Sequence, residues 1–181
     1  MEAPLLADGL CIRPYAEEDI ADFVTAVRES VGTVGVWMPW CVGSYSSADA
    51  KAWFDQCSAN LSASHAYDVG IFSAEGRTLY GGIAINQINR QHNFGNIGYW
   101  VRQSRQRQGI ALRAVRVIAA FGFNFLKLTR LEIVAAEDNI ASRGVAERAG
   151  AAFECVARNR LVMNGQPLDA AVYSLTPGQI K

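Results

Sequence analysis

The sequence predicts an α/β (α+β) fold, a mixed sheet with helices packed on both faces. Extended and helical segments follow one another in the order β-α-α-β-β-β-α-β-α-β-β, a pattern typical of layered folds. Half of the 181 residues are hydrophobic, which is enough for a chain of this length to bury a core. Asn164-Gly165 stands between two extended runs near the end of the chain and predicts a closing hairpin.

The first expected elements are one strand and two helices. Residues 10–13 are expected to form a short strand. Apolar residues then recur at helical spacing and give the first helix one apolar face, at Ile20, Phe23, Val24 and Val27. After a loop over 32–44, Ser46 and Asp49 have the spacing of a capping box. This spacing predicts a second helix that runs to about Ser62.

The rest of the chain predicts six more strands and two more helices. Strands are expected over 66–72, 79–88 and 94–101, separated by turn-forming residues. A helix is expected over 110–127, and its polar residues form a single stripe, so it should pack on the sheet. A strand over 131–135, a helix over 141–149 and the hairpin around Asn164-Gly165 complete a seven-stranded sheet.

Composition argues against several classes of protein. The 17 basic and 17 acidic side chains cancel, so we expect neither a nucleic acid nor a membrane partner. The four cysteines form no CxxC pair, which favours reduced thiols in a cytoplasmic protein over a metal site or disulfides. The first residues lack the basic and apolar regions of a signal peptide, and no stretch approaches the roughly 20 apolar residues of a membrane helix. We therefore expect residues 1–181 to form one cytoplasmic domain without a metal.

A basic, glycine-containing loop before the third helix predicts a phosphate site. The first turn of a helix exposes unpaired backbone N–H groups that favour anions. Gly109 lets a ligand approach the backbone closely, while Arg105 and Arg107 add positive charge. An ordinary turn with solvated arginines is the alternative. An RNA-binding patch is less consistent with so compact a cluster, because RNA sites usually spread charge among aromatic residues.

The segment Gln106-Arg107-Gln108-Gly109-Ile110-Ala111 resembles the (Gln/Arg)-x-x-Gly-x-(Gly/Ala) signature of the GNAT (Gcn5-related N-acetyltransferase) superfamily. Other segments are similar to its ribosomal-protein-alanine (RimJ/RimL-like) branch: Ile97-Gly98-Tyr99-Trp100-Val101, Leu128-Thr129-Arg130-Leu131-Glu132, Asp138-Asn139-Ile140-Ala141-Ser142 and Met38-Pro39-Trp40. They follow the order of that branch along nearly the whole chain. The chain is thereby identified as a member of this family.

The resemblance implies an enzyme that moves the acetyl group of acetyl-coenzyme A to a primary amine. It implies a mostly antiparallel sheet whose fourth and fifth strands splay apart to admit the coenzyme. The residues that it implies for coenzyme binding are Tyr99, Trp100, Val101, Gln106, Arg107, Gln108, Gly109, Ile110, Ala111 and Asn139. Asn139 could equally cap the following helix. Because relatives are often dimers, a homodimer is also expected.

Ser142 is the residue that the resemblance implies for protonating the departing thiolate. Many members place a tyrosine seven residues after the Asn139 position, but here that residue is Ala146. An ordinary serine in the first helical turn is the alternative. The general base stays unassigned, and the candidates for it are Glu132, Glu137, Asp68, His65 and His92.

The amine acceptor is either a protein N-terminus or a small molecule. Trp37 and Trp40 lie in a loop with Gly and Pro and are expected to line the acceptor pocket, although they could also fill core. Trp53 is expected to be core. A different class of function is a coenzyme A-binding sensor without turnover, which would be compatible with the missing tyrosine.

Overall fold

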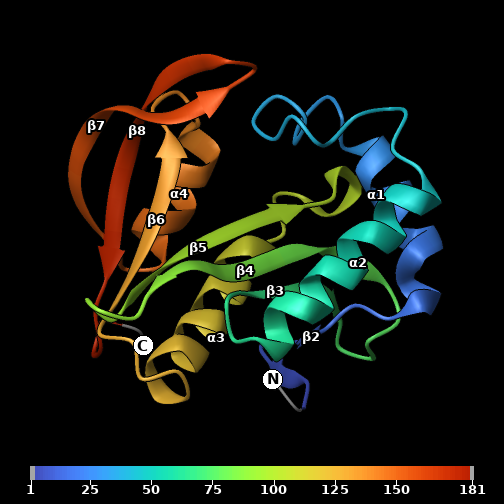
Figure 1. Cartoon of the computed structure of the whole chain (residues 1–181), viewed down its shortest axis with the longest axis horizontal. Helices are drawn as coiled ribbons and strands as arrows, with labels where there is room; N and C mark the ends of the chain where they lie inside the picture. The colour runs from blue at the N-terminus through green and yellow to red at the C-terminus, as the bar shows by residue number, and fades with distance from the viewer. Residues whose placement is uncertain (1–2, 180–181) are drawn as a thin grey trace.

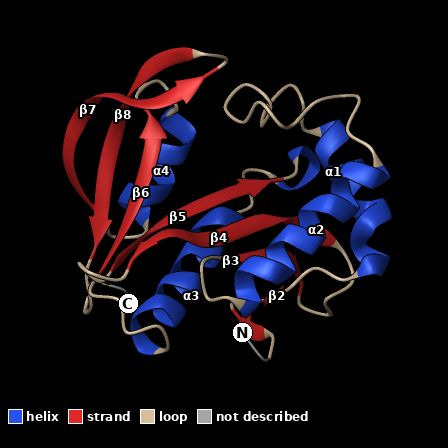
Figure 2. Ribbon diagram, in the orientation of Figure 1, coloured by secondary structure: helices blue, strands red, loops and turns tan. Residues whose placement is uncertain are grey.

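The computed structural model describes residues 3–179, and its centre is an eight-stranded mixed sheet in the order β1-β2-β3-β4-β5-β6-β8-β7 (Figures 1 and 2). The strands are β1 (Leu5–Ala7), β2 (Leu10–Arg13), β3 (Tyr67–Ser73), β4 (Leu79–Asn89), β5 (Phe94–Val101), β6 (Arg130–Ala136), β7 (Ala152–Met163) and β8 (Gln166–Leu175). The helices are α1 (Ile20–Glu29), α2 (Ser47–Ser62), α3 (Ile110–Asn124) and α4 (Ile140–Arg148). Figure 1 shows α1 and α2 on one face of the sheet and α3 on the other.

The sheet has eight strands where seven were expected, and the additional strand is β1. β1 pairs antiparallel with β2, and Ala7 lies opposite Leu10. Between them Asp8 and Gly9 have φ values of 52° and 71°, the left-handed values of a two-residue hairpin turn. Asp-Gly is a known hairpin signal, so the sequence did contain a sign of this strand.

The predicted elements all form, and most differences are at their ends. Ser46 caps α2, because its side chain accepts from the Asp49 N–H while the Asp49 side chain accepts from the Ser46 N–H. Asn164-Gly165 closes the β7–β8 hairpin, with Met163 opposite Gln166. The third helix ends at Asn124 instead of continuing to Lys127. Lys127 has a φ of 58°, which a right-handed helix does not accommodate.

The two faces of the sheet carry separate hydrophobic clusters. Alternate residues of a strand point to opposite faces, so β4 directs Ile83 and Ile85 toward α3. α3 lies close to the sheet at Gly122, where an added Cβ would lie 2.9 Å from Ile85 and Leu131 atoms. On the α1 and α2 face, β4 carries the small residues Gly82 and Ala84, so few side-chain atoms project from it and its surface is low there. This leaves space between β4 and the elements that cover this face.

Arg102 joins α1 to the end of β5. Its side chain is buried and forms ion pairs of 2.7 Å with Asp22 and 2.8 Å with Glu29. The same guanidinium donates to the Leu79 carbonyl, and Asp22 accepts from the Leu79 N–H. Hydrogen bonds from Arg102 lower the pKa of Glu29 to about 2. This arginine is thus structural, and it orients the loop that follows β5.

We predict that Arg102→Gln lowers the free energy of unfolding by about 2–4 kcal/mol, because it leaves two carboxylates without their cation. The pKa of Glu29 is depressed, so its contribution is present above about pH 4.5 and is lost as pH falls toward 2. The difference in free energy of unfolding between the wild type and Arg102→Gln should therefore become smaller as pH falls from about 4.5 toward 2. Urea unfolding at several pH values measures this difference. Lys51→Gln, which removes an exposed pair with Asp55, is the control and should cost less than about 0.5 kcal/mol.

Candidate active site

A gap opens in the middle of the sheet, where β5 and β6 separate. The two strands run parallel and pair only from Phe94–Arg130 to Asn96–Glu132. Beyond that point β5 remains paired with β4, and β6 remains paired with β8. The edge of β5 from Ile97 to Val101 therefore has no strand beside it. This is the splay that the resemblance implied for the fourth and fifth predicted strands (Figure 1).

The loop after β5 leads to the N-terminus of α3 with two left-handed residues. Arg107 has a φ of 61°, and Gly109, the N-cap of α3, has a φ of 72° with no side-chain cap. A Cβ added at Gly109 would meet nothing within 4 Å. The first intrahelical bond runs from the Arg113 N–H to the Gly109 carbonyl, so the amides before it point outward from the helix. The local structure is an open cradle of N–H donors.

Gln106 has a different position from the one expected of a direct ligand. Its side-chain amide donates to the Val101 carbonyl at 2.9 Å and to the Thr33 hydroxyl at 3.1 Å. The side chain thus ties the loop to the end of β5 and to the segment after α1. The sequence pattern alone does not distinguish this internal role from contact with a ligand.

The arginine cluster divides into internal and outward members. Arg102 is buried in its ion pairs, and Arg113 and Arg116 donate to the backbone carbonyls of Asp8 and Arg148. Arg105 and Arg107 remain beside the cradle, with the Arg105 guanidinium 5.2 Å from the centre of the Tyr80 ring. The positive charge is therefore local to the N-terminus of α3 and does not cover a broad face.

Two residues face each other across the gap, one from each side. The Tyr99 hydroxyl on β5 lies 2.9 Å from the Ser142 hydroxyl on α4 and donates to the Ser142 carbonyl at 3.0 Å. Asn139 is the N-cap of α4, and its side-chain oxygen accepts from the Ser142 N–H. Burial raises the pKa of Tyr99 to about 12, although the hydrogen bond with Ser142 opposes the rise. The phenol therefore keeps its proton at neutral pH.

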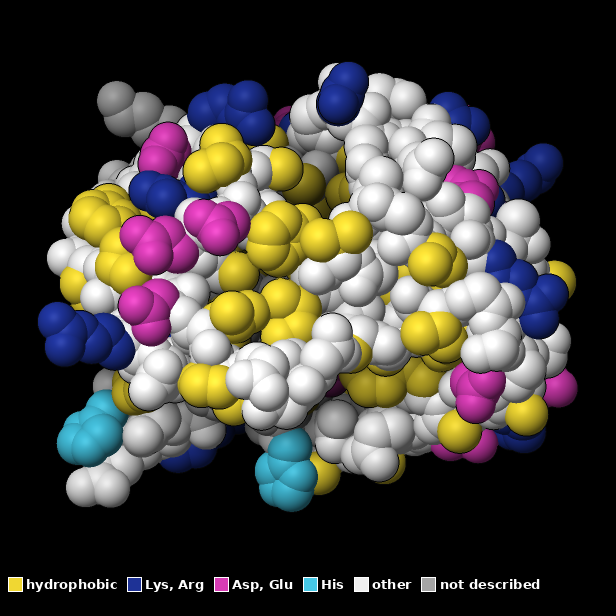
Figure 3. Space-filling model, turned by 90° about the horizontal axis from the view of Figure 1, so that it is seen from above, with side chains coloured by type: hydrophobic (Ala, Val, Ile, Leu, Met, Phe, Trp, Pro, Cys, Tyr) yellow, Lys and Arg dark blue, Asp and Glu magenta, His cyan; other side chains and the backbone are white. Residues whose placement is uncertain are grey.

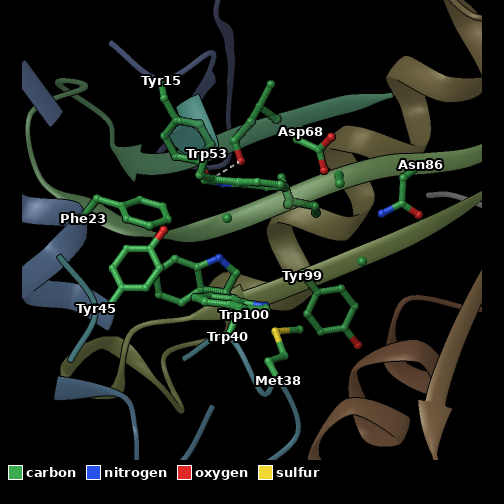
Figure 4. A pocket seen from close by; sticks show the side chains of 15 residues that line it. Tyr15, Phe23, Met38, Trp40, Tyr45, Trp53, Asp68, Asn86, Tyr99 and Trp100 are labelled. Atoms are coloured by element: carbon green, nitrogen blue, oxygen red, sulfur yellow. Dashed lines mark hydrogen bonds between the residues drawn. The ribbon is translucent and has the colours of Figure 1, made fainter. Parts of the chain in front are cut away.

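A cavity of about 330 Å³ lies on the α1 and α2 side of the sheet, beside Gly98, Tyr99 and Trp100. In Figure 3 hydrophobic side chains gather around the middle of the face that is seen, and charged side chains lie mostly to either side. The aromatic residues that line the cavity are Tyr15, Phe23, Trp40, Tyr45, Trp53, Tyr99 and Trp100. Figure 4 shows Asp68 and Asn86 on the side of the cavity away from Phe23 and Tyr45.

The cavity includes some of the predicted acceptor residues and not others. Trp40 and Met38 line it, but Trp37, from the same loop, is not among its lining residues. Trp53 also lines it and is 38% exposed, so the expectation that Trp53 is core was wrong. Its place on α2 above the low surface of β4 explains this difference. Sequence reasoning could not find it, because the height of α2 above the sheet depends on side chains from β3 and β4.

The hydroxyl of Tyr99 was missed by sequence reasoning. The pattern suggested only a backbone role for the residue. Its contact with Ser142 joins segments that are 43 positions apart in the chain, so no local signal exists for it. Ala146, which stands where many relatives have a tyrosine, is a residue of α4 and is fully buried.

Among the candidate bases, Asp68 alone lines the cavity. Glu132 forms a 3.0 Å ion pair with Arg130, and Glu137, His65 and His92 are exposed. Within residues 3–179 no group of three His, Cys, Asp or Glu side chains is placed to hold a metal ion. No helix in that range is long and apolar enough to cross a membrane.

Comparisons with known proteins agree with this geometry. Residues 9–152 match the family model described as an acetyltransferase (GNAT) domain. A Vibrio cholerae structure, provisionally described as a ribosomal-protein-serine acetyltransferase, is 32% identical, has a TM-score of 0.86, and matches over 97% of this chain and 98% of that one. RimL, described as a ribosomal L7/L12 alpha-N-protein acetyltransferase in complex with coenzyme A, has a TM-score of 0.86 over 96% and 97% of the chains. Because RimL is only 20% identical to this chain, its similarity shows the fold alone.

Among curated proteins, YdaF of Bacillus subtilis is 36% identical over 98 residues, 54% of each chain. It is provisionally described as a ribosomal N-acetyltransferase. The chain spans about half the length of the curated relatives that it matches.

We predict that the phenol of Tyr99 titrates near pH 12, because its place in the gap disfavours the phenolate. Absorbance at high pH, compared between the wild type and Tyr99→Phe, isolates this group. Circular dichroism at each pH serves as the check that both proteins stay folded. A difference curve centred near pH 10, the ordinary value for tyrosine, would show that the hydroxyl is solvated.

Proposed function

Because the chain belongs to the GNAT family of acetyltransferases, we propose that it moves the acetyl group of acetyl-coenzyme A to a primary amine. One observation carries the proposal. The gap between β5 and β6, the N–H cradle of α3 and the cavity all meet at the carboxyl end of β5. A thioester laid along the free edge of β5 would therefore point toward the cavity, where an amine can attack it.

The cradle and the edge of β5 are proposed to hold the coenzyme. Backbone amides of residues 108–111, with Arg105 and Arg107, suit a pyrophosphate, since a helix N-terminus adds partial positive charge. The free backbone of Tyr99, Trp100 and Val101 suits the amides of the pantetheine arm. Gln106 and Asn139 have internal partners in the structure, so we propose that they act by shaping the loop and the start of α4.

The cavity is proposed to receive the acceptor, a small primary amine. A protein N-terminus would need an open groove with a polar lining. Instead, the cavity is walled by aromatic rings and has a volume of about 330 Å³, close to the lower limit of ordinary small-molecule sites. The cavity lies on the α1 and α2 face of the sheet and α3 lies on the other, so the two proposed sites suit direct attack in a ternary complex.

Ser142 and Tyr99 are proposed to act on the leaving sulfur. When Tyr99 donates its proton to the Ser142 hydroxyl oxygen instead of the Ser142 carbonyl, the Ser142 hydroxyl proton is free to point into the gap. Sulfur gains charge as the C–S bond breaks, and the serine proton then forms a hydrogen bond to it. Such a bond is strongest in the transition state, where it lowers the barrier.

We also propose that residues 1–181 act as one cytoplasmic N-acetyltransferase domain and pair as a homodimer. The continuous sheet from β1 to β7 supports the single domain, and four free cysteines support the compartment. Light scattering at micromolar concentration tests the dimer.

Gly109→Asp should weaken acetyl-coenzyme A binding at least about hundredfold, because a carboxylate would stand where the pyrophosphate is proposed to lie. Calorimetry measures the affinity. Gly178→Asp is the matched control, since Gly178 also has a positive φ and open space around it but lies near the C-terminus. Equal affinity in the two variants would refute the proposed coenzyme site.

Ser142→Ala should lower kcat about 10- to 100-fold and change acetyl-coenzyme A affinity less than about threefold, because the hydroxyl acts chiefly as charge builds on sulfur. Ser142→Cys should recover part of the rate, since a thiol is the stronger acid. Thiol release against a panel of amines and N-terminal peptides gives kcat. A wild-type kcat in Ser142→Ala would leave Ser142 as an ordinary helix residue. If no acceptor causes thiol release from the wild type, the coenzyme-binding sensor becomes the better proposal.

A further inference from the structure

Asp68 is a buried carboxylate that faces the acceptor cavity. It lies on β3, is 9% exposed, and is the sole acidic or basic residue among the described residues lining the cavity. None of the ion pairs within residues 3–179 includes it. A buried charge without a counter-ion is costly, and it favours the arrival of a cation.

Asp68 lies in the same cross-strand row as Gly98, at the edge of β5 where the thioester is proposed to lie. Asp68 lies opposite Ala84 on β4, and Ala84 lies opposite Gly98 on β5. Residues that are directly opposite share a face of the sheet. Because strands are about 4.8 Å apart, Asp68 and Gly98 lie about 10 Å apart across the row. The small Ala84 and Gly98 leave the space between the carboxylate and the edge of β5 clear.

The rest of the cavity suits a cation that carries an apolar group. Trp100 packs edge-on against Phe23 and Trp40, with ring centres 5.6 Å and 5.5 Å apart, so these rings hold one another in place. A Cβ at Gly82 would lie 2.6 Å from both Trp100 and the Tyr15 hydroxyl, so glycine there lets both side chains lie low over the sheet. Aromatic faces attract ammonium groups and pack against apolar substituents.

Building on the proposed function, we infer that Asp68 binds the ammonium group of the acceptor and takes its first proton. The acceptor class is then a small primary amine, protonated in water, with an aromatic or alkyl group that fills the cavity. The base that the sequence left unassigned is thereby Asp68, acting directly or through one water.

The surroundings of Asp68 suit this role. Burial raises the pKa of the carboxyl, and a side-chain hydrogen bond from Asn60 on α2 opposes the rise only in part. The other titratable groups that face it are Cys57 on α2 and Tyr15 before α1. Burial, with the charge of Asp68 adding to it, raises the pKa of both, so both stay neutral near pH 7. A base whose pKa is moved toward the working pH is better suited to catalysis.

The reaction balances with one base and one thiolate. The ammonium gives a proton to the Asp68 carboxylate, which passes it to solvent. The neutral nitrogen forms a bond to the thioester carbon, and the C–S bond breaks with its electron pair moving to sulfur. The nitrogen then loses its second proton to solvent, and the sulfur takes the proton of Ser142, which regains one from solvent. Each turnover yields one amide, one thiol and one released proton.

A binding experiment tests the recognition step without turnover. Calorimetry compares 2-phenylethylamine with its uncharged analogue 2-phenylethanol on the wild type and on Asp68→Asn. We expect the wild type to prefer the amine at least about tenfold and the variant to lose that preference. Asp55 is an exposed carboxylate on α2, so the control variant Asp55→Asn should keep the preference for the amine. No binding of the amine to the wild type, or an unchanged preference in Asp68→Asn, would overturn the inference.

Kinetics tests the proton step. With 2-phenylethylamine as acceptor, kcat/KM of the wild type should fall as pH drops through the pKa of Asp68, because the base must be ionised. Asp68→Asn should lose about 10²- to 10⁴-fold in kcat and lack that acidic limb, while acetyl-coenzyme A affinity and folding are retained. Wild-type kcat and pH profile in Asp68→Asn would remove Asp68 from the mechanism and leave the proposed function standing. Failure of the proposed function would instead appear as no coenzyme binding or no thiol release by the wild type.

Discussion

The separation of β5 from β6 is the constraint on which the rest of the molecule depends. Each strand keeps a full partner on its far side, so the sheet stays intact on both sides of the gap. Backbone groups on the inner edges still need partners, because unpaired buried amides and carbonyls are costly. The Gln106 side chain donates to the Val101 carbonyl at the end of β5. The remaining edge of β5 is left available for an extended ligand.

The loop after β5 is tied to α1 and to the segment that follows α1. Arg102 fixes its start to Asp22 and Glu29 of α1, while the Gln103 N–H donates to Ser30 at the end of α1. Gln106 then contacts Thr33, a few residues before Trp40. The cradle of N–H groups and the segment that carries part of the cavity wall are therefore held by one set of polar contacts. A change in the position of the loop would therefore move both the cradle and this part of the cavity wall.

Local sequence patterns predicted the elements well and the cavity poorly. Capping at Ser46 and the Asn164-Gly165 hairpin depend on neighbours in the chain, so local chemistry was sufficient. The short strand β1 was not predicted, although Asp8-Gly9 is a hairpin signal. Trp53, Tyr99 and Asp68 depend on which strands lie side by side and how far a helix stands above them. Those distances follow from the packing of the whole chain, and periodicity does not report them.

The small residues on the cavity face of β4 have a consequence for how the protein can change over evolution. Gly82 and Ala84 form the floor of the cavity, whereas Trp53 of α2 and residues of the loops before and after α1 form part of its walls. Substitutions in those walls can alter the shape offered to an acceptor without touching the edge of β5 or the start of α3. The two halves of the site can thus diverge at different rates. A fold with this division can acquire new acceptors while its donor chemistry is inherited unchanged.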